Sequence, residues 1–195
     1  MELLHHGIIK RKGERVFMIK KEIKRSVVIL VTIGFVLFLS LALPRVSAYT
    51  TKTIGGFDSP DTSFLYSAED MYTMANNYSD SGRSTYVFLR WTFDVIWPLV
   101  YTAFLVVWTV KLSVYVKGKN WIQSLYFLPI LAMALDFLEN MGASIVMFRY
   151  PATSGIIAHL TPIATLLKRT TLSVSFVLVL LLSLVILYQK VMKKT

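Results

Sequence analysis

Apolar residues along this chain gather into four blocks that are separated by polar segments. The blocks cover residues 27–43, 87–110, 121–148 and 171–188, and a helix needs about 20 apolar residues to cross a bilayer. No block alternates apolar and polar residues at the length of a barrel strand, so helices are indicated rather than a β-barrel. The pattern predicts an all-α fold, an integral membrane four-helix bundle, with residues 26–190 forming a single four-span domain.

Composition agrees with a membrane protein and narrows the chemistry. Hydrophobic residues make up 55% of the chain and charged residues 16%, whereas about a quarter of a typical soluble domain is charged. There is no cysteine, which excludes disulfides, thiol catalysis and thiolate metal sites. The sequence contains no glycine-rich phosphate-binding motif and no nucleophile motif. No cofactor and no metal site are predicted.

Lysine and arginine residues predict the orientation of the four spans. Fourteen of them flank the expected inner ends and six the outer ends, so both termini are expected in the cytoplasm of a cell membrane and residues 44–86 outside. The exception is the loop 149–170, which would carry three basic residues outside. Residues 1–25 form a basic cytoplasmic segment, of which 10–25 are expected to lie along anionic inner-leaflet lipids. Because these flanks account for the net charge of +10, lipid rather than nucleic acid is the expected partner.

The start of the chain leaves two alternatives open. Val46-Ser47-Ala48 follows the first apolar block and imitates a signal-peptide cleavage site. Because the apolar run is slightly long for a signal peptide and the basic region before it is very long, a retained first span is favoured. Cleavage would leave three spans. Met18 could also be the true initiator, with residues 1–17 as a dispensable extension.

The segment 44–86 is expected to divide into a loop and a helix. Residues 49–63 are rich in Thr, Ser, Gly, Asp and Pro, which is typical of irregular loop. Ser67 then predicts the N-cap of an extracytoplasmic amphipathic helix, with Glu69 and Asp70 at the positive end of its dipole. The aromatic side of this helix is expected at the level of the lipid headgroups.

Two other connections carry structural expectations. The turn 117–120 is short, so spans two and three should pack as an antiparallel hairpin. Residues 151–168 are too few to cross and return and include Pro162, which predicts an interfacial or partly re-entrant helix. Small residues on span three would permit close contact with a neighbouring helix: Ala132, Ala134, Gly142, Ala143 and Ser144.

Three carboxylates lie inside the apolar blocks, Asp94 in the second and Asp136 and Glu139 in the third. An ionisable group in hydrocarbon needs a partner, a proton or a cavity. At 1.5 Å per residue, Asp94 would lie about 10 Å from the outer end of its span, Glu139 about 12–14 Å and Asp136 about 18 Å. Since the two spans are antiparallel, the three groups are predicted to meet in the outer half of the membrane.

Helical spacing places these residues on two stripes that should both face the bundle interior. Arg90 is expected to pair with Asp94, and Lys168, just outside span four, with Glu139. Pro98 should leave one backbone carbonyl free a turn earlier, as an acceptor in the interior. The stripes contain Arg90, Asp94, Pro98 and Tyr101 on span two, and Asp136, Glu139 and Asn140 on span three.

The leading interpretation is an outer-facing acidic pocket that binds or carries a small cation, an amine or a lipid headgroup. Three carboxylates against Arg90 and Lys168 would leave about one excess negative charge. The expected ligand-binding residues are Asp94, Asp136, Glu139, Asn140, Arg90, Tyr101 and Lys168.

Other functions stay open on the sequence alone. An intramembrane lipid-modifying enzyme could use Asp136 or Glu139 as a general acid or base, so enzymatic activity is undecided. A structural or accessory subunit would use the charges only to fix helix register. A metal bound by these acids and His159 lacks the ligand spacing of known sites, and a lone histidine here is more typical of the membrane interface. The oligomeric state is undetermined.

Four sequence elements together resemble a family of bacterial four-span integral membrane proteins that has no established activity. They are Tyr66-x-x-Glu69, Gly82-Arg83 followed by Tyr86, Asp94-x3-Pro98-x2-Tyr101, and Pro129-x6-Asp136-x2-Glu139-Asn140. The tyrosine of the second element follows Arg83 by three residues, one fewer than in the family pattern. The resemblance covers residues 64–169, and it implies four spans in a bacterial inner membrane with both termini inside.

Overall fold

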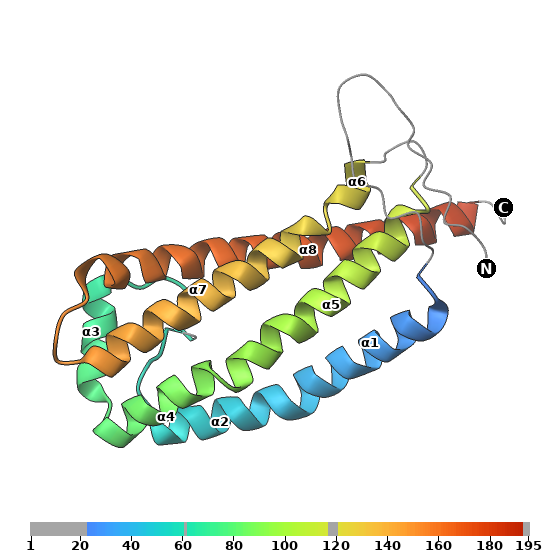
Figure 1. The fold of residues 1–195 in the computed structure, drawn as a ribbon. Helices are drawn as coiled ribbons and strands as arrows, with labels where there is room; N and C mark the ends of the chain where they lie inside the picture. The colour runs from blue at the N-terminus through green and yellow to red at the C-terminus, as the bar shows by residue number, and fades with distance from the viewer. Residues whose placement is uncertain (1–22, 61, 117–120, 193–195) are drawn as a thin grey trace, which may run out of the picture.

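The computed structural model describes residues 23–60, 62–116 and 121–192, and every regular element in these ranges is a helix. Four helical segments are long and apolar enough to cross a membrane, which indicates a multi-pass membrane protein. Figure 1 shows them side by side, with the start of α1 and the end of α8 at the same end of the bundle. Most of the basic segment 1–25 and the turn 117–120 lie outside the described residues. The four segments are Arg25–Thr53, Asp80–Ser113, Phe127–Arg149 and Gly155–Met192.

The first span is longer than predicted. It consists of α1 (Arg25–Leu37), a π-helical turn η1 (Phe38–Ala42) and α2 (Leu43–Thr53), so the irregular segment expected from residue 49 begins only after Thr53. Pro44 has no N–H group for the Ser40 carbonyl, and the helix widens there, with the Leu43 N–H bonded to the Phe38 carbonyl. Pro44 then lies in the first turn of α2, where proline is tolerated.

The second span is interrupted. Its first part, α4 (Asp80–Arg90), begins seven residues before the predicted start because the Ser79 hydroxyl caps it by accepting a hydrogen bond from the Gly82 N–H at 3.0 Å. The helix breaks at Trp91 and Thr92 and resumes as α5 (Phe93–Ser113). The break places Asp94 in the first turn of α5.

The predicted helix after Ser67 and its cap are present as α3 (Ala68–Asn77). Ser67 and Asp70 form a capping box, in which the Ser67 hydroxyl accepts from the Asp70 N–H at 3.1 Å and the Asp70 carboxylate accepts from the Ser67 N–H at 2.8 Å. Met71 and Ala75 are completely buried. Figure 1 shows α3 lying across one end of the bundle, hereafter the α3 end; that this end faces outward stays a prediction.

Removing this cap should loosen α3 without changing the rest of the bundle. We expect Ser67→Ala to destabilise the helix by about 1 kcal/mol, measured as faster amide hydrogen exchange of residues 71–77. The Thr73→Ala substitution on the exposed side of the same helix is the control and should change exchange much less. Equal effects of the two substitutions would contradict the importance of the cap.

The same cap predicts a pH dependence. The N–H and then the hydroxyl of Ser67 donate to the Asp70 carboxylate and lower the pKa of Asp70 below its ordinary value. A carboxyl group with a lowered folded pKa stabilises above its unfolded pKa, about 4, and this contribution is lost as the pH falls through the folded pKa. Exchange protection of α3 should therefore decrease below about pH 4. Asp70→Asn should remove that dependence, whereas Ser67→Ala keeps the backbone N–H and should remove only the smaller part that the hydroxyl contributes.

The segment expected to be a separate interfacial helix is instead the first part of a span. After α6 (Trp121–Ser124) and α7 (Phe127–Arg149), a short turn leads into α8 (Gly155–Met192), which continues through Pro162 for 38 residues. A proline in a helix removes one N–H donor, and here the close packing of α7 against α8 holds the helix together. Lys168 and Arg169, expected outside the last span, therefore lie within α8.

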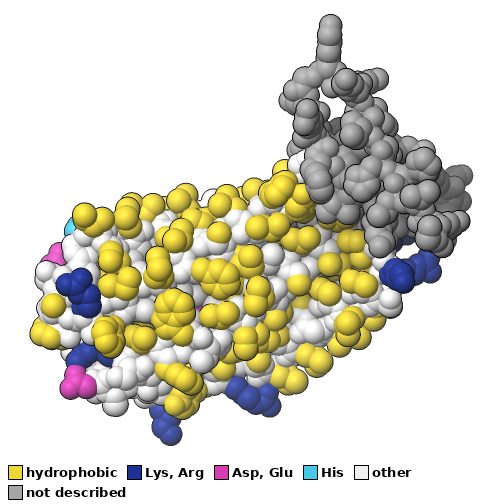
Figure 2. Space-filling model, in the orientation of Figure 1, with side chains coloured by type: hydrophobic (Ala, Val, Ile, Leu, Met, Phe, Trp, Pro, Cys, Tyr) yellow, Lys and Arg dark blue, Asp and Glu magenta, His cyan; other side chains and the backbone are white. Residues whose placement is uncertain are grey.

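Helices α7 and α8 approach closely at small residues, as predicted for most of them. Ala132 and Ala143 are completely buried, and Gly142 lies against Thr161 of α8. Ala134 does not take part, because it is exposed on the outside of α7. Figure 2 shows hydrophobic side chains over most of the visible face of the bundle, as expected where lipid surrounds the helices.

The first span is attached to the bundle by aromatic side chains. The Phe35 ring stacks on the Phe104 ring with their centroids 4.1 Å apart, and Phe176 of α8 lies 6.0 Å from Phe35. The Trp108 indole N–H donates to the Thr32 hydroxyl at 2.9 Å. Most of the remaining surface of this span is exposed, so it is the least embedded of the four.

Candidate functional site

The break between α4 and α5 brings a charged pair against α7. Arg90, the last residue of α4, has its Nε atom 3.2 Å from Oδ2 of Asp94, the i,i+4 pair that the sequence predicts. Its Nη1 atom donates to Oδ1 of Asn140 at 3.0 Å. The Asn140 amide in turn donates to the backbone carbonyl of Asp94 at 3.0 Å, and this is the carbonyl that Pro98 leaves without a helical partner. The predicted free acceptor is therefore confirmed and satisfied by Asn140.

A second group of charges joins α5, α7 and α8. The Tyr101 hydroxyl donates to Oδ2 of Asp136 at 3.0 Å, and the Lys168 ammonium lies 3.4 Å from Oδ1 of the same carboxylate. Lys168 also forms an ion pair with Glu139, as predicted. The structure thus brings together all seven predicted site residues as two groups, which adjoin at Glu139 and Asn140 of α7 and are hereafter called the network.

The charged residues share one level of the bundle, although deeper than expected. Asp94 follows the start of α4 by 14 residues, Asp136 precedes the end of α7 by 13, and Lys168 follows the start of α8 by 13. At 1.5 Å per residue, each lies about 20 Å along its span from the α3 end. Lys168 was expected to reach down from outside the last span. It lies instead within α8, opposite Asp136.

Burial confirms that both stripes face the interior. Glu139 and Tyr101 are completely buried, and Arg90, Asp136 and Asn140 are each at most 5% exposed. The Asp94 side chain is the most accessible of the carboxylates in the network, at 19%. Charges at such positions are retained in proteins when they are paired, and the ion pairs above meet that condition.

A cavity of about 390 Å³ opens onto this network between α2, α5, α8 and the segment after α2. Its charged lining residues are Arg90, Asp94, Asp136, Lys168 and Arg169. Leu43, Phe93, Trp97 and Leu172 give it an apolar side, and hydroxyl groups of α2 line another. The volume lies within the range of small-molecule sites.

The charge of the site differs from the prediction. The expected negative excess counted only Arg90 and Lys168 as cations and did not include Arg169. The structure adds Arg169 to the lining, so three cations face the two lining carboxylates, and Glu139 brings the number of carboxylates at the site to three. Glu139 does not line the cavity and lies behind Lys168. The site is charge-balanced rather than acidic.

Two residues at the site were missed by the sequence interpretation. The Arg90 guanidinium lies 4.6 Å from the centre of the buried Tyr86 ring; extending the stripe of span two by one turn would have included this tyrosine. Arg169 donates to the Pro60 carbonyl at 3.3 Å and lies 5.5 Å from the Phe64 ring. No pattern indicated Arg169, because its position depends on the continuity of α8.

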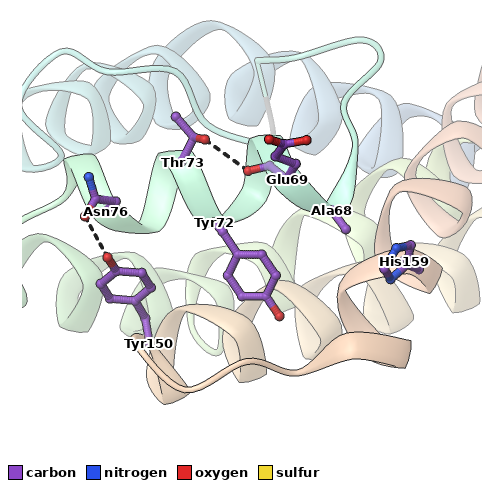
Figure 3. A pocket seen from close by; sticks show the side chains of 7 residues that line it. All are labelled: Ala68, Glu69, Tyr72, Thr73, Asn76, Tyr150 and His159. Atoms are coloured by element: carbon purple, nitrogen blue, oxygen red, sulfur yellow. Dashed lines mark hydrogen bonds between the residues drawn. The ribbon is translucent and has the colours of Figure 1, made fainter.

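His159 lies apart from the network. It is exposed, and its Nδ1 atom contacts the Gly155 carbonyl at 2.7 Å. Figure 3 shows it at the edge of a surface hollow of about 530 Å³ between α3 and the start of α8, where Tyr150 donates to Asn76 at 2.6 Å. The four-residue metal set that included His159 is therefore not brought together.

Comparison of the chain with protein-family models, with curated proteins and with solved structures found no match. The likeness to bacterial four-span proteins is therefore a resemblance of motifs. The structure itself shows a cavity beside the buried network of a multi-pass membrane protein, with equal numbers of cations and carboxylates when Glu139 is included.

Proposed function

We propose that this protein binds the headgroup of a zwitterionic, amine-bearing lipid in the cavity between α2, α5 and α8. The observation that carries the proposal is the composition of the cavity lining. Carboxylates, cations and an apolar side lie together within a space of about 390 Å³. A small cation alone would leave the balanced site with an excess positive charge, whereas a ligand with both charges would not.

The two lining carboxylates are suited to the amine of such a ligand. Of the two, Asp94 is the more accessible. The Tyr101 hydroxyl holds Asp136 in place by donating to its Oδ2 atom. Charge-assisted hydrogen bonds to fixed carboxylates are about twice as strong as neutral ones. Asn140 holds the backbone of Asp94, so the acceptor is oriented before the ligand enters.

The rest of the lining suits the remainder of a lipid. Arg169 supplies the positive charge that a phosphate would face. Leu43 and Leu172 supply apolar contacts on α2 and α8, where acyl chains could leave the cavity. We further propose that the α3 end faces outward and both termini lie in the cytoplasm, because the positive-inside rule favours it and the start of α1 lies at the same end of the bundle as the end of α8 (Figure 1).

Removing both lining carboxylates should abolish binding. In purified protein titrated with glycerophosphoethanolamine, the soluble headgroup, we expect the Asp94→Asn/Asp136→Asn variant to bind at least about a hundredfold more weakly. Trp97 lines the cavity, so its fluorescence can report binding when the other three tryptophans are replaced by phenylalanine. Glu69→Gln on the exposed side of α3 is the control. Unchanged binding in the double variant would refute the proposal.

Separate titrations distinguish the source of the headgroup. Ethanolamine tests the amine alone, inorganic phosphate tests the anion alone, and nanodiscs of phosphatidylethanolamine test the intact lipid. Tighter binding of the intact lipid than of the soluble headgroup is expected, because the apolar side of the cavity contributes only to the former.

A scaffold or accessory subunit is the second candidate, favoured by the internal pairing of the network. Arg90 with Asp94, and Lys168 with Asp136 and Glu139, already satisfy one another. Such pairs can serve only to fix helix register. This candidate predicts that variants of the network change stability while no headgroup binds to the unmodified protein.

A further inference from the structure

We propose that Lys168 occupies the amine position of the site until a ligand displaces it, and that the site therefore selects primary amines. This inference rests on the proposed function and specifies its ligand class. In the structure the Lys168 ammonium lies between two carboxylates, Asp136 in the cavity lining and Glu139 behind it.

Lys168 is held unequally by its two partners. Its ammonium lies 3.4 Å from Asp136, longer than a charge-assisted hydrogen bond of about 2.7–2.9 Å, and it contacts Glu139 more closely. A ligand that took over Asp136 would therefore replace the weaker of the two interactions. Tyr101 holds the other oxygen of Asp136, so the carboxylate would keep its orientation during the exchange.

Glu139 is suited to keep the displaced ammonium. It is completely buried, and its Oε1 atom has no hydrogen-bond partner among the described residues. Because Glu139 does not line the cavity, a ligand does not compete for it. The exchange would leave every charge with a partner: the ligand amine with Asp136 and Asp94, its phosphate with Arg169, and Lys168 with Glu139. Arg90 would keep Asp94, the Asn140 side chain and the ring of Tyr86.

The position left by Lys168 defines the chemistry of the ligand. A lysine ammonium is compact and has three N–H donors, and a primary ammonium group reproduces both properties. A quaternary ammonium has no N–H donor and is larger. Ethanolamine headgroups are therefore favoured over choline headgroups, although both carry the same charges.

The first test compares two ligands that differ only in the amine. Wild-type protein is titrated with glycerophosphoethanolamine and with glycerophosphocholine, with Trp97 fluorescence as the readout. We expect the first to bind at least about tenfold more tightly. Equal affinities would overturn the assignment of the site to primary amines.

The second test changes the competition itself. With Glu139→Gln, Lys168 has only Asp136 as an anionic partner, so glycerophosphoethanolamine should bind about tenfold more weakly. With Lys168→Met and Glu139→Gln together, the net charge is conserved and Asp136 has no internal competitor, so binding should become about tenfold tighter than in wild type. The double variant removes an ion pair as a unit, which limits the loss of stability.

The outcomes separate this inference from the proposed function. Weaker binding in the Lys168→Met/Glu139→Gln variant would show that Lys168 assists the ligand, and would overturn displacement. Unchanged binding in Glu139→Gln and in Lys168→Met/Glu139→Gln would also overturn displacement. Loss of binding in Asp94→Asn/Asp136→Asn would still support the site. Absence of glycerophosphoethanolamine binding to wild-type protein would defeat the proposed function and this inference together.

Discussion

Replacing Arg90 by methionine is expected to lower the free energy of unfolding by about 3–5 kcal/mol. The Arg90 side chain is only 5% exposed, and it pairs with Asp94, donates to Asn140 and lies over the Tyr86 ring. Its removal would leave the Asp94 carboxylate without its closest cation in a poorly solvated place, which costs more than the lost contacts themselves. Unfolding of the purified protein by increasing SDS in mixed micelles, followed by circular dichroism, measures the change.

A second substitution separates the charge from the packing. Adding Asp94→Asn to Arg90→Met removes the unpaired carboxylate, so the double variant should recover a large part of the lost stability, and the two effects should not add. Arg45→Met on α2 is the control, because Arg45 is exposed and, among the described residues, bonds only to the Leu41 carbonyl of the preceding turn η1. A loss below 1 kcal/mol in Arg90→Met would show that the network does not hold the bundle.

The second large effect is expected at the contact between α7 and α8. A Cβ atom added at Gly142 would lie 2.1 Å from the Thr161 hydroxyl oxygen, too close for any real contact. That hydroxyl donates to the Ile157 carbonyl at 2.8 Å, so turning it away also breaks a hydrogen bond. Gly142→Ala should therefore destabilise the protein by about 1–3 kcal/mol, the usual cost of overpacking, in the same unfolding assay.

Matched substitutions identify the clash as the cause. Gly142→Ala together with Thr161→Ala should recover most of the stability, because Oγ1 and Cγ2 of Thr161 are gone and only its Cβ, 3.2 Å from the added atom, remains. Gly34→Ala places the same change in α1, where nothing lies within 4 Å of the added atom; it should be neutral or stabilising by up to about 1 kcal/mol. If Gly142→Ala behaves like Gly34→Ala, α7 and α8 are not in close contact there.

The helix break at Trp91 and Thr92 connects stability with the proposed binding. It ends α4 at Arg90 and starts α5 just before Asp94, so this pair joins two helical segments. The π-helical turn of the first span, Phe38–Ala42, directly precedes the part of α2 that lines the cavity. Irregular turns of this kind are frequent beside functional sites, which agrees with the position of the cavity.

The amino-acid sequence by itself determined the apolar spans, the N-cap at Ser67 and the faces that carry the charges. These features depend on local properties: the length of apolar runs, the hydrogen bonds of one side chain, and the 3.6-residue period of a helix. The pairing of Arg90 with Asp94 was predicted from that period. The structure keeps the pair, although the break at Trp91 and Thr92 places the two residues on separate helical segments.

Only the tertiary structure decided where the helices end and which charges share the cavity. Pro44 and Pro162 suggest helix ends in the sequence, yet a π-helical turn accommodates the first and contacts with α7 support the helix around the second. The continuity of α8 moved Lys168 and Arg169 from an expected loop to the level of Asp136. The balance of charge at the site, and with it the kind of ligand that it can bind, is therefore a property of helix packing that no local pattern contains.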